Sequence, residues 1–318
     1  MPRHIIEAKM ICRLTAIATA LIALDCWRFP NTRVFGFSLS SKPVSTLISE
    51  NSDKISHLKE AAVAIASDAP EDDVFYLRYA LAELGDEEMQ RRLKDNIKWR
   101  SSDEGRLICD AAKTAIATAI SSDKWNNDPV RSAAPYASIV NKYITEASIV
   151  TTPSREGDLI YCIRAASIDD AALMDAISVE DMSKWFLYTK EVNSAVANQR
   201  SLDSDRLVCV CTANDLSGIK VIGGSAEFRK ALSAASQKAN ELYPTLSGPS
   251  LLLNLPRLLG ALAKLFTPLF PEEVRKKIKF ARGPLSDVTE LSEILAGSGD
   301  KRKRDNFLDA VDELVYSD

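Results

Sequence analysis

Few residues of this sequence have a type and spacing that support catalysis. The chain has two histidines, His4 and His57, and contains no GxSxG elbow, no Walker loop and no GxGxxG fingerprint, so the common nucleophile–base and phosphate-binding motifs are missing. The turn Gly223-Gly224-Ser225 precedes a predicted helix and could bind an anion through backbone amides, although an ordinary helix N-terminus explains it as well. With no general base beside a nucleophile, we predict that the protein is not an enzyme.

The six cysteines do not form a metal-binding pattern. They occur without a CxxC pair or a histidine cluster, at Cys12, Cys26, Cys109, Cys162, Cys209 and Cys211, so we predict neither a metal site nor a cofactor. Cys209 and Cys211 are two residues apart in a predicted strand and therefore point to the same face. We expect both to be small buried hydrophobic residues rather than a metal or redox pair.

Composition limits the class of partner. The 318 residues are 46% hydrophobic and 26% charged, which is ordinary for a globular protein with a sizeable core. The net charge of −4 leaves no basic excess to neutralise phosphates, so we expect no nucleic acid partner. Any attraction to anionic lipid must come from a local basic patch.

Residues 251–270 are the most apolar part of the chain. They read LLLNLPRLLGALAKLFTPLF, with nine Leu and two Phe. Pro256 and Pro268 lack a backbone donor, and three polar residues would be costly in hydrocarbon, namely Asn254, Arg257 and Lys264, so the segment does not have the pattern of a membrane span. We predict a strand over residues 251–254, a break at Pro256 and a helix from residue 257 to about 266.

This predicted helix has apolar residues around most of its circumference. They form two adjacent stripes at helical spacing, Leu258, Leu262, Leu265 and Leu269, and Leu259, Ala263, Phe266 and Phe270. Such a helix is buried in a protein core, contacts a membrane or covers a bound apolar ligand. The segment alone leaves these three alternatives open.

The start of the chain has the character of a targeting leader. Three basic residues within the first 13 precede an apolar stretch, 14–24, of the length of a signal-peptide core, and residues 26–49 are rich in Ser and Thr and contain no acidic residue. A signal-like segment followed by a transit-like segment resembles the two-part leaders of algae with secondary plastids. We therefore expect a leader over residues 1–50 and a plastid location, with endomembrane or secreted and then cytoplasmic location as the alternatives.

The rest of the chain divides into a helical part and an α/β part. Between residues 52 and 120, apolar residues recur at helical spacing, which predicts a helical subdomain over residues 51–126. Residues 158–164, 207–212, 251–254 and 278–281 read as strands, with helices predicted over 179–198 and 226–242. Strand–helix–strand units imply right-handed parallel crossovers, so the predicted fold class is α/β with a mainly parallel sheet flanked by helices.

Three further segments have weaker patterns. We predict helix between residue 129 and the turn at residue 153, and another near residues 287–295. The tail, 297–318, holds the basic cluster Lys301-Arg302-Lys303-Arg304 and an amphipathic helix with Phe307, Leu308, Val311, Leu314 and Val315 on one side. The cluster is a candidate contact with an anionic membrane surface.

Residues 243–280 resemble the CRAL-TRIO lipid-binding domain. In that family a Tyr-Pro ends a helix, an apolar strand ends at Asn-x-Pro, a gate helix follows, and a short helix leads into a Lys-Ile strand. The matching residues here are Tyr243-Pro244, Asn254-Leu255-Pro256, residues 257–270 and Lys277-Ile278. Upstream, Asp215-Leu216-Ser217-Gly218 is similar to the family's Asp-Leu-x-Gly turn, which extends the CRAL-TRIO-like domain to about residues 127–296.

The resemblance implies a non-enzymatic carrier that holds one amphiphile in an apolar pocket between sheet and gate and exchanges it as a peripheral protein at membranes. The residues expected to contact the lipid are Leu252, Leu258, Leu262, Leu265, Phe266, Phe270 and Lys277. Members that bind phosphatidylinositol have an acid after Tyr-Pro and basic residues in the N-terminal helices. Thr245, Leu81 and Glu83 occupy those positions here, so phospholipid and isoprenoid ligands both remain open, as does an interaction or tethering module that holds no exchangeable lipid.

Overall fold

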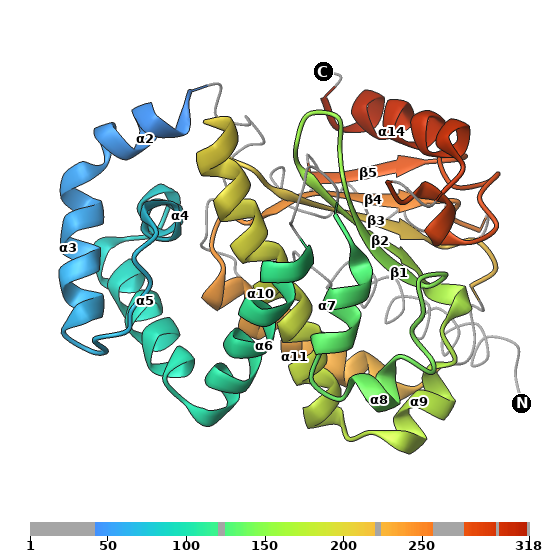
Figure 1. Cartoon of the computed structure of the whole chain (residues 1–318), viewed down its shortest axis with the longest axis horizontal. Coiled ribbons are helices and arrows are strands. Elements are labelled where there is room, and N and C mark those ends of the chain that lie inside the picture. Colours follow the sequence, from blue (N-terminus) through green and yellow to red (C-terminus); the bar gives the residue numbers. More distant parts are fainter. Residues whose placement is uncertain (1–41, 120–124, 220–223, 257–276, 297–298, 317–318) are drawn as a thin grey trace, which may run out of the picture.

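The computed structural model describes residues 42–119, 125–219, 224–256, 277–296 and 299–316. Figure 1 shows a group of helices at the left, a twisted sheet at the right, and the long helix α10 (Val179–Ser204) running between them. Helix α11 (Ala226–Leu242) lies beside α10, and α14 (Lys301–Tyr316) lies on the opposite side of the sheet. The predicted α/β class with an N-terminal helical part is confirmed.

The helical subdomain has a core of its own. It consists of α2 (Val44–Glu50), α3 (Ser52–Val63), α4 (Asp73–Leu81) and α5 (Asp86–Arg100), whose buried side chains form one cluster that includes Val44, Leu58, Leu77 and Leu93. The first described helix begins at Val44, so residues 44–50 of the predicted leader are helical. Helix α6 (Asp103–Ala119) follows, but its buried Ile108, Ala112 and Ala115 join the core under α10.

Buried polar contacts attach the subdomain to the sheet domain. Arg100 at the end of α5 donates two hydrogen bonds of 2.8 Å to the carboxylate of Glu191 on α10, which also accepts one of 2.9 Å from the Tyr243 hydroxyl. The Tyr79 hydroxyl and the Asn96 amide both donate to the carbonyl of Leu242 at the end of α11. The two parts of the chain therefore form one packed body.

The sheet has five strands in the order β1-β2-β3-β4-β5. They are β1 (Ile149–Pro153), β2 (Leu159–Arg164), β3 (Val210–Asp215), β4 (Ser247–Leu253) and β5 (Ile278–Ala281). Strands β2 to β5 are parallel to one another, as predicted, and β1 is antiparallel to β2. The sheet is thus mainly parallel, and the carboxyl ends of four strands meet at one edge.

Strand β1 corrects the prediction of helix before residue 153. Short helices do occupy α7 (Asn127–Ala133) and α8 (Ala137–Val140), but the β-branched run at Ile149–Pro153 pairs with β2. The outer edge of β1 is satisfied by Asn127, whose side chain accepts from the Thr151 amide at 2.9 Å and donates to the Thr151 carbonyl at 3.0 Å. One asparagine takes the place of a neighbouring strand at this edge.

The two faces of the sheet are covered differently. On the face that we call the α10 face, Ile149, Leu159, Tyr161 and Val210 pack with α6, α10 and α11. On the opposite face, the α14 face, residues of β1 to β4 such as Ile160, Ala213 and Leu253 pack with Phe307, Leu308, Val311 and Val315 of α14. The apolar side predicted for the last helix is therefore confirmed, with Leu314 only partly buried.

The predicted helices between the strands begin at the expected residues, and α10 extends six residues beyond its predicted end at residue 198. The hydroxyl of Ser178 accepts from the Asp181 amide at the start of α10, and Ser225 caps α11 in the same way through Phe228. The helix predicted near residues 287–295 is wrong, since only the single 3₁₀ turn η3 (Leu291–Ile294) forms there. A further short helix, α9 (Asp170–Ala176), precedes α10. In the described part of the chain, no helix has the length and apolar character needed to cross a membrane.

Candidate functional site

The pairing register of the strands shows which side chains lie on the α10 face of the sheet. One row across the sheet is formed by Thr151, Tyr161, Thr212 and Ser250, so four hydroxyl-bearing residues stand side by side on four strands. The next row toward the carboxyl edge is formed by Ile163, Asn214, Leu252 and Phe280. This face is therefore polar across its middle and mostly apolar toward its carboxyl edge.

The apolar cluster at the carboxyl edge, which we call the β4–β5 patch, consists of Leu216, Leu252 and Ile278, with Ile219 and Leu255 packed against them. Among the described residues it is separate from the large core under α10, which contains no side chain of β4 or β5. Phe280, the register partner of Leu252, is 40% exposed. The patch is thus a second apolar surface on the α10 face, distinct from the packed core.

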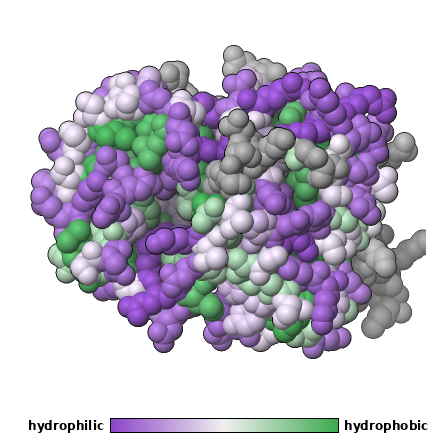
Figure 2. Space-filling view, viewed as in Figure 1, coloured by the Kyte–Doolittle hydropathy of each residue, from purple (hydrophilic) through white to green (hydrophobic). Residues whose placement is uncertain are grey.

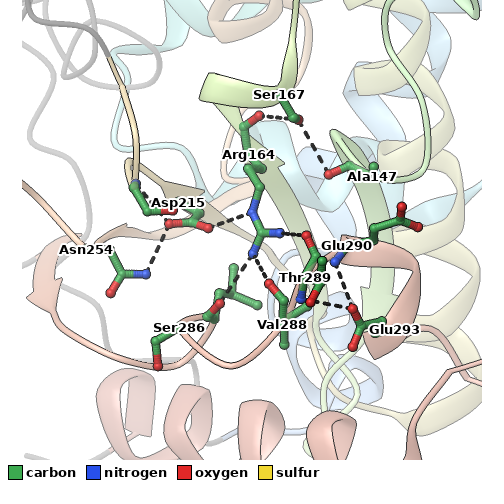
Figure 3. Close-up of polar contacts among 12 residues, drawn as sticks. Ala147, Arg164, Ser167, Asp215, Asn254, Ser286, Val288, Thr289, Glu290 and Glu293 are labelled. Carbon is green, nitrogen blue, oxygen red and sulfur yellow. Dashed lines mark hydrogen bonds and ion pairs between the residues drawn. The ribbon is translucent and has the colours of Figure 1, made fainter.

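A polar network holds the carboxyl ends of three strands together (Figure 3). Arg164, the last residue of β2, donates to the carboxylate of Asp215, the last residue of β3, at 2.8 Å. Asp215 also accepts from the Asn254 amide, which follows β4, at 3.0 Å. Because Asp215 is completely buried, Arg164 supplies the neutralising charge that its carboxylate needs.

Arg164 also binds the segment after β5. Its guanidinium donates to the carbonyl oxygens of Leu285, Val288 and Thr289, with the Val288 contact at 2.7 Å. The side-chain oxygen of Asn254 accepts from the Gly283 amide at 2.9 Å. The network therefore fixes both the residue that leads from β4 into residues 257–276 and the loop that follows β5.

Two tight turns complete this edge. Asn254 has a positive φ of 56°, a conformation that asparagine adopts more readily than most residues. In the turn Asp215-Leu216-Ser217-Gly218 the Asp215 carboxylate accepts from the Ser217 amide, and Gly218 has a φ of 71°. The turn singled out in the sequence is therefore present, whereas Arg164 carried no sequence signal beyond its position at the end of a strand.

The structure describes two of the predicted lipid-contacting residues, whose side chains lie toward opposite ends of β4. Leu252 lies in the β4–β5 patch and is 3% exposed. The half-buried Lys277 immediately precedes Ile278 of the patch, and its ammonium group donates to the carbonyl of Ser247, the first residue of β4. The other five, Leu258, Leu262, Leu265, Phe266 and Phe270, lie outside the described residues, as do Arg257 and Lys264.

Thr245, one of the positions that differ from the phosphatidylinositol-binding pattern, has a structural role together with Arg78. Arg78 of α4 is 2% exposed and donates to the Asn198 side chain and to the carbonyls of Val208 and Thr245. Thr245 in turn has a positive φ of 54°, and its hydroxyl contacts the carbonyl of Arg78. This pair joins the helical subdomain to the loop before β4.

The basic cluster at the start of α14 is only partly available to a membrane. Lys303 pairs with Glu293, and Arg304 donates to the Thr152 hydroxyl at 2.6 Å and to the Ile294 carbonyl at 2.8 Å. Lys301 and Arg302 are exposed. Two of the four cations therefore hold α14 against the sheet domain, which halves the local positive charge free to meet anionic lipid.

The two remaining candidate sites from the sequence have ordinary structural explanations. At the N-terminus of α11, the Asp170 carboxylate of α9 accepts from the Ser225 amide at 2.8 Å, so a carboxylate of the chain itself occupies the position of a bound anion. Burial and the nearby Asp158 carboxylate raise the pKa of the Cys209 thiol to about 11, and Cys211 is buried among apolar residues. No group of His, Cys, Asp or Glu side chains within the described ranges could hold a metal ion.

The face of the molecule in Figure 2 offers no better candidate for an apolar binding site than the β4–β5 patch. Figure 2 shows a mainly hydrophilic face, with hydrophobic residues gathered chiefly over the helical subdomain near α2 and α4. The large hydrophobic residues that are most exposed, Val63 and Leu202, stand on the separate helices α3 and α10.

The sequence of the sheet region matches a known domain. Residues 147–295 match the family model of the CRAL/TRIO domain. The chain contains a CRAL/TRIO domain. The match begins just before β1 and ends after η3, so it includes all five strands, the β4–β5 patch and the Arg164 network.

Other comparisons add little to this assignment. The crystal structure of Sfh5 aligns with 14% sequence identity over 75% of this chain and 80% of that chain, with a TM-score of 0.44. No curated protein matches the sequence. CRAL/TRIO domains generally bind and transfer lipids or other small hydrophobic molecules rather than catalyse reactions, and the domain therefore indicates this class of function for the chain.

Proposed function

We propose that this protein binds a single lipid on the α10 face of its CRAL/TRIO domain, with residues 257–270 as the gate, and exchanges it at membranes as a peripheral protein. The observation that carries the proposal is the β4–β5 patch. It contains the buried Leu252 and Ile278, and Phe280, the register partner of Leu252, is 40% exposed beside it, near Asn254, from which the chain enters the leucine-rich segment. Apolar side chains on both sides of a bound molecule would shield an acyl or isoprenoid chain from water.

The proposal predicts that the purified protein carries one lipid. Native mass spectrometry of protein made in its own cells should show a bound mass that organic extraction releases as a phospholipid or an isoprenoid. Transfer of that lipid between donor and acceptor vesicles should be faster with the protein than without it. A mass equal to that of the chain alone, together with no transfer of any lipid class, would contradict the proposal.

Replacing Phe280 by aspartate should reduce lipid loading by at least about tenfold. A carboxylate beside Leu252 would have to lose its hydration when the lipid binds, which costs more than the about 1.4 kcal/mol that corresponds to a tenfold change. Because Phe280 is 40% exposed, the substitution should leave the fold intact. Loading is measured by mass spectrometry after incubation with vesicles.

Lys279→Asp is the matched control, because residue 279 follows the same strand but points to the α14 face beside Leu251. It should load lipid as the unchanged protein does. Equal loading of both variants would place the lipid elsewhere. The alternative is an interaction or tethering module. It would be supported if neither the unchanged protein nor any variant holds lipid, and if the double change Leu262→Asp with Phe266→Asp abolishes capture of a protein partner.

We also propose that the protein is delivered to a plastid by its leader. The support is the order of a signal-like apolar stretch and an acid-free, Ser-rich stretch before Glu50. Fusing residues 1–50 to a fluorescent protein in an alga with secondary plastids should direct the fusion to the plastid. Fluorescence confined to the secretory pathway or the cytoplasm would contradict the proposal.

A further inference from the structure

The central strand, β3, carries a side-chain amide that is buried and has no hydrogen-bond partner for its nitrogen among the described residues. Asn214 on β3 is 3% exposed, and its side-chain nitrogen has no hydrogen-bond partner among the described residues. Burial removes water from this donor, so the amide is less stable here than it would be with any acceptor in reach. Such a group in the middle of a sheet is uncommon enough to need an explanation.

The register places this amide on the α10 face at the border of the β4–β5 patch. Asn214 stands between Ile163 on β2 and Leu252 on β4, and Leu216, in the turn directly after β3, packs with Leu252. Leu216 and Leu252 are both members of the patch. The donor is therefore flanked on three sides by apolar side chains, and its fourth neighbour on this face, Thr212, is uncharged.

A second buried amide, that of Asn193, differs from Asn214 because it lies beside a small cavity. The side-chain nitrogen of Asn193 on α10 is also without a partner among the described residues, but Asn193 lines a cavity of about 30 Å³ next to β1. That volume suits one water molecule, and Thr151 and Trp185, which both carry polar side-chain atoms, are among the residues that line the same cavity. Asn214 is not one of its lining residues.

The charges at this edge lie on the other side of the sheet. Asp215, the next residue, points to the α14 face, where Arg164 neutralises it. The described strand residues that flank Asn214 on its own face carry no charge, and Lys190 of α10 lies over the ring of Tyr161, in the neighbouring row, at 6.0 Å. A neutral donor in apolar surroundings fits an oxygen atom without formal charge.

We infer that the amide of Asn214 donates a hydrogen bond to an uncharged oxygen of the bound lipid, an ester carbonyl or a hydroxyl, and so selects oxygen-bearing lipids over hydrocarbon-like ones. The inference rests on the proposed lipid-binding function. A ligand that supplies this acceptor satisfies the amide, whereas a ligand without it leaves the amide buried and unpaired, which is the stronger source of discrimination.

The test uses two matched pairs of lipids and the delipidated full chain. One set of vesicles contains equal amounts of a diester phosphatidylcholine and its diether analogue with the same chains. The other contains phytol and phytane in equal amounts in the diether lipid. The unchanged protein should take up the diester or phytol in an excess of about fivefold or more, which corresponds to about 1 kcal/mol. Preference in the first pair identifies an ester carbonyl, and preference in the second identifies a hydroxyl.

Asn214→Leu should bring that ratio close to one while the delipidated protein melts at the same or a higher temperature, since an unpaired donor has been removed. Asn214→Met gives the same readout should the leucine variant not fold. Asn193→Leu, the matched control, should keep the preference. The inference is overturned if the unchanged protein takes up both lipids of each pair equally, or if both Asn214 variants keep the preference. Either result leaves the proposed lipid-binding function standing. No uptake of any of the four lipids overturns this inference, and the proposed function is overturned with it if the protein from its own cells also carries no lipid and transfers none.

Discussion

Replacing Glu191 by glutamine is expected to lower the free energy of unfolding by about 3 kcal/mol or more. Glu191 is 6% exposed, and its carboxylate receives two hydrogen bonds from Arg100 and one from the Tyr243 hydroxyl. Glutamine has nearly the same shape but no charge, so the guanidinium of Arg100 would remain largely buried without a counterion. Urea unfolding followed by circular dichroism measures the change.

Helix α5 offers its own control. Arg91 contacts Glu88 and Asp95 on the same helix, and all three side chains are at least 38% exposed. Arg91→Met should therefore cost less than about 1 kcal/mol, as exposed pairs usually do. Adding Arg100→Met to Glu191→Gln should recover part of the lost stability, because the uncompensated charge is removed. Equal and small effects of Glu191→Gln and Arg91→Met would show that the buried pair does not hold the two parts of the chain together.

Replacing Arg164 by methionine should have a comparable effect, about 3–5 kcal/mol. The carboxylate of Asp215 is fully buried and would lose its only ion-pair partner within the described residues. The loop after β5 would also lose the guanidinium contacts to Leu285, Val288 and Thr289. Thermal and urea unfolding should both record the loss.

The rescue for Arg164→Met is the second change Asp215→Asn. Asparagine keeps an oxygen that can accept from the Ser217 amide and from Asn254, but it carries no charge. The double variant should therefore be more stable than Arg164→Met alone by about 1 kcal/mol or more. If Arg164→Met alone costs less than about 1 kcal/mol, Asp215 does not depend on this partner. The network would then not be what fixes Asn254 at the root of residues 257–276.

Much of the fold could be predicted from local patterns. Ser178 and Ser225 mark helix starts, and the apolar runs of β2 and β4 mark strands buried on both faces. Strand β1 was missed because its stability comes from a distant side chain, Asn127, and from pairing with β2. The start of α2 was missed because an acid-poor, Ser-rich stretch looks the same whether it is removed or ends in a helix.

The candidate site was predictable only in part. Leu252 stood out as the middle of an apolar strand, and the register places it in the β4–β5 patch. Arg164, Asp215 and Asn254 are 39 to 51 residues apart in adjacent pairs, and only the parallel order of β2, β3 and β4 brings them to one edge. Asn214 could not be found from the sequence at all, because its significance depends on the partners that it lacks.

The position of α14 has a consequence for how the protein is made. Helix α14 covers the α14 face, and Arg304 and Tyr316 bind Thr152 and Asp158, more than 150 residues earlier in the chain. During synthesis, one face of the sheet therefore stays open until residues 301–316 have left the ribosome. Contacts between such distant parts of a chain form slowly and leave apolar strands exposed in the meantime. The nascent protein should consequently need a chaperone, or rapid completion of its last helix, to avoid aggregation.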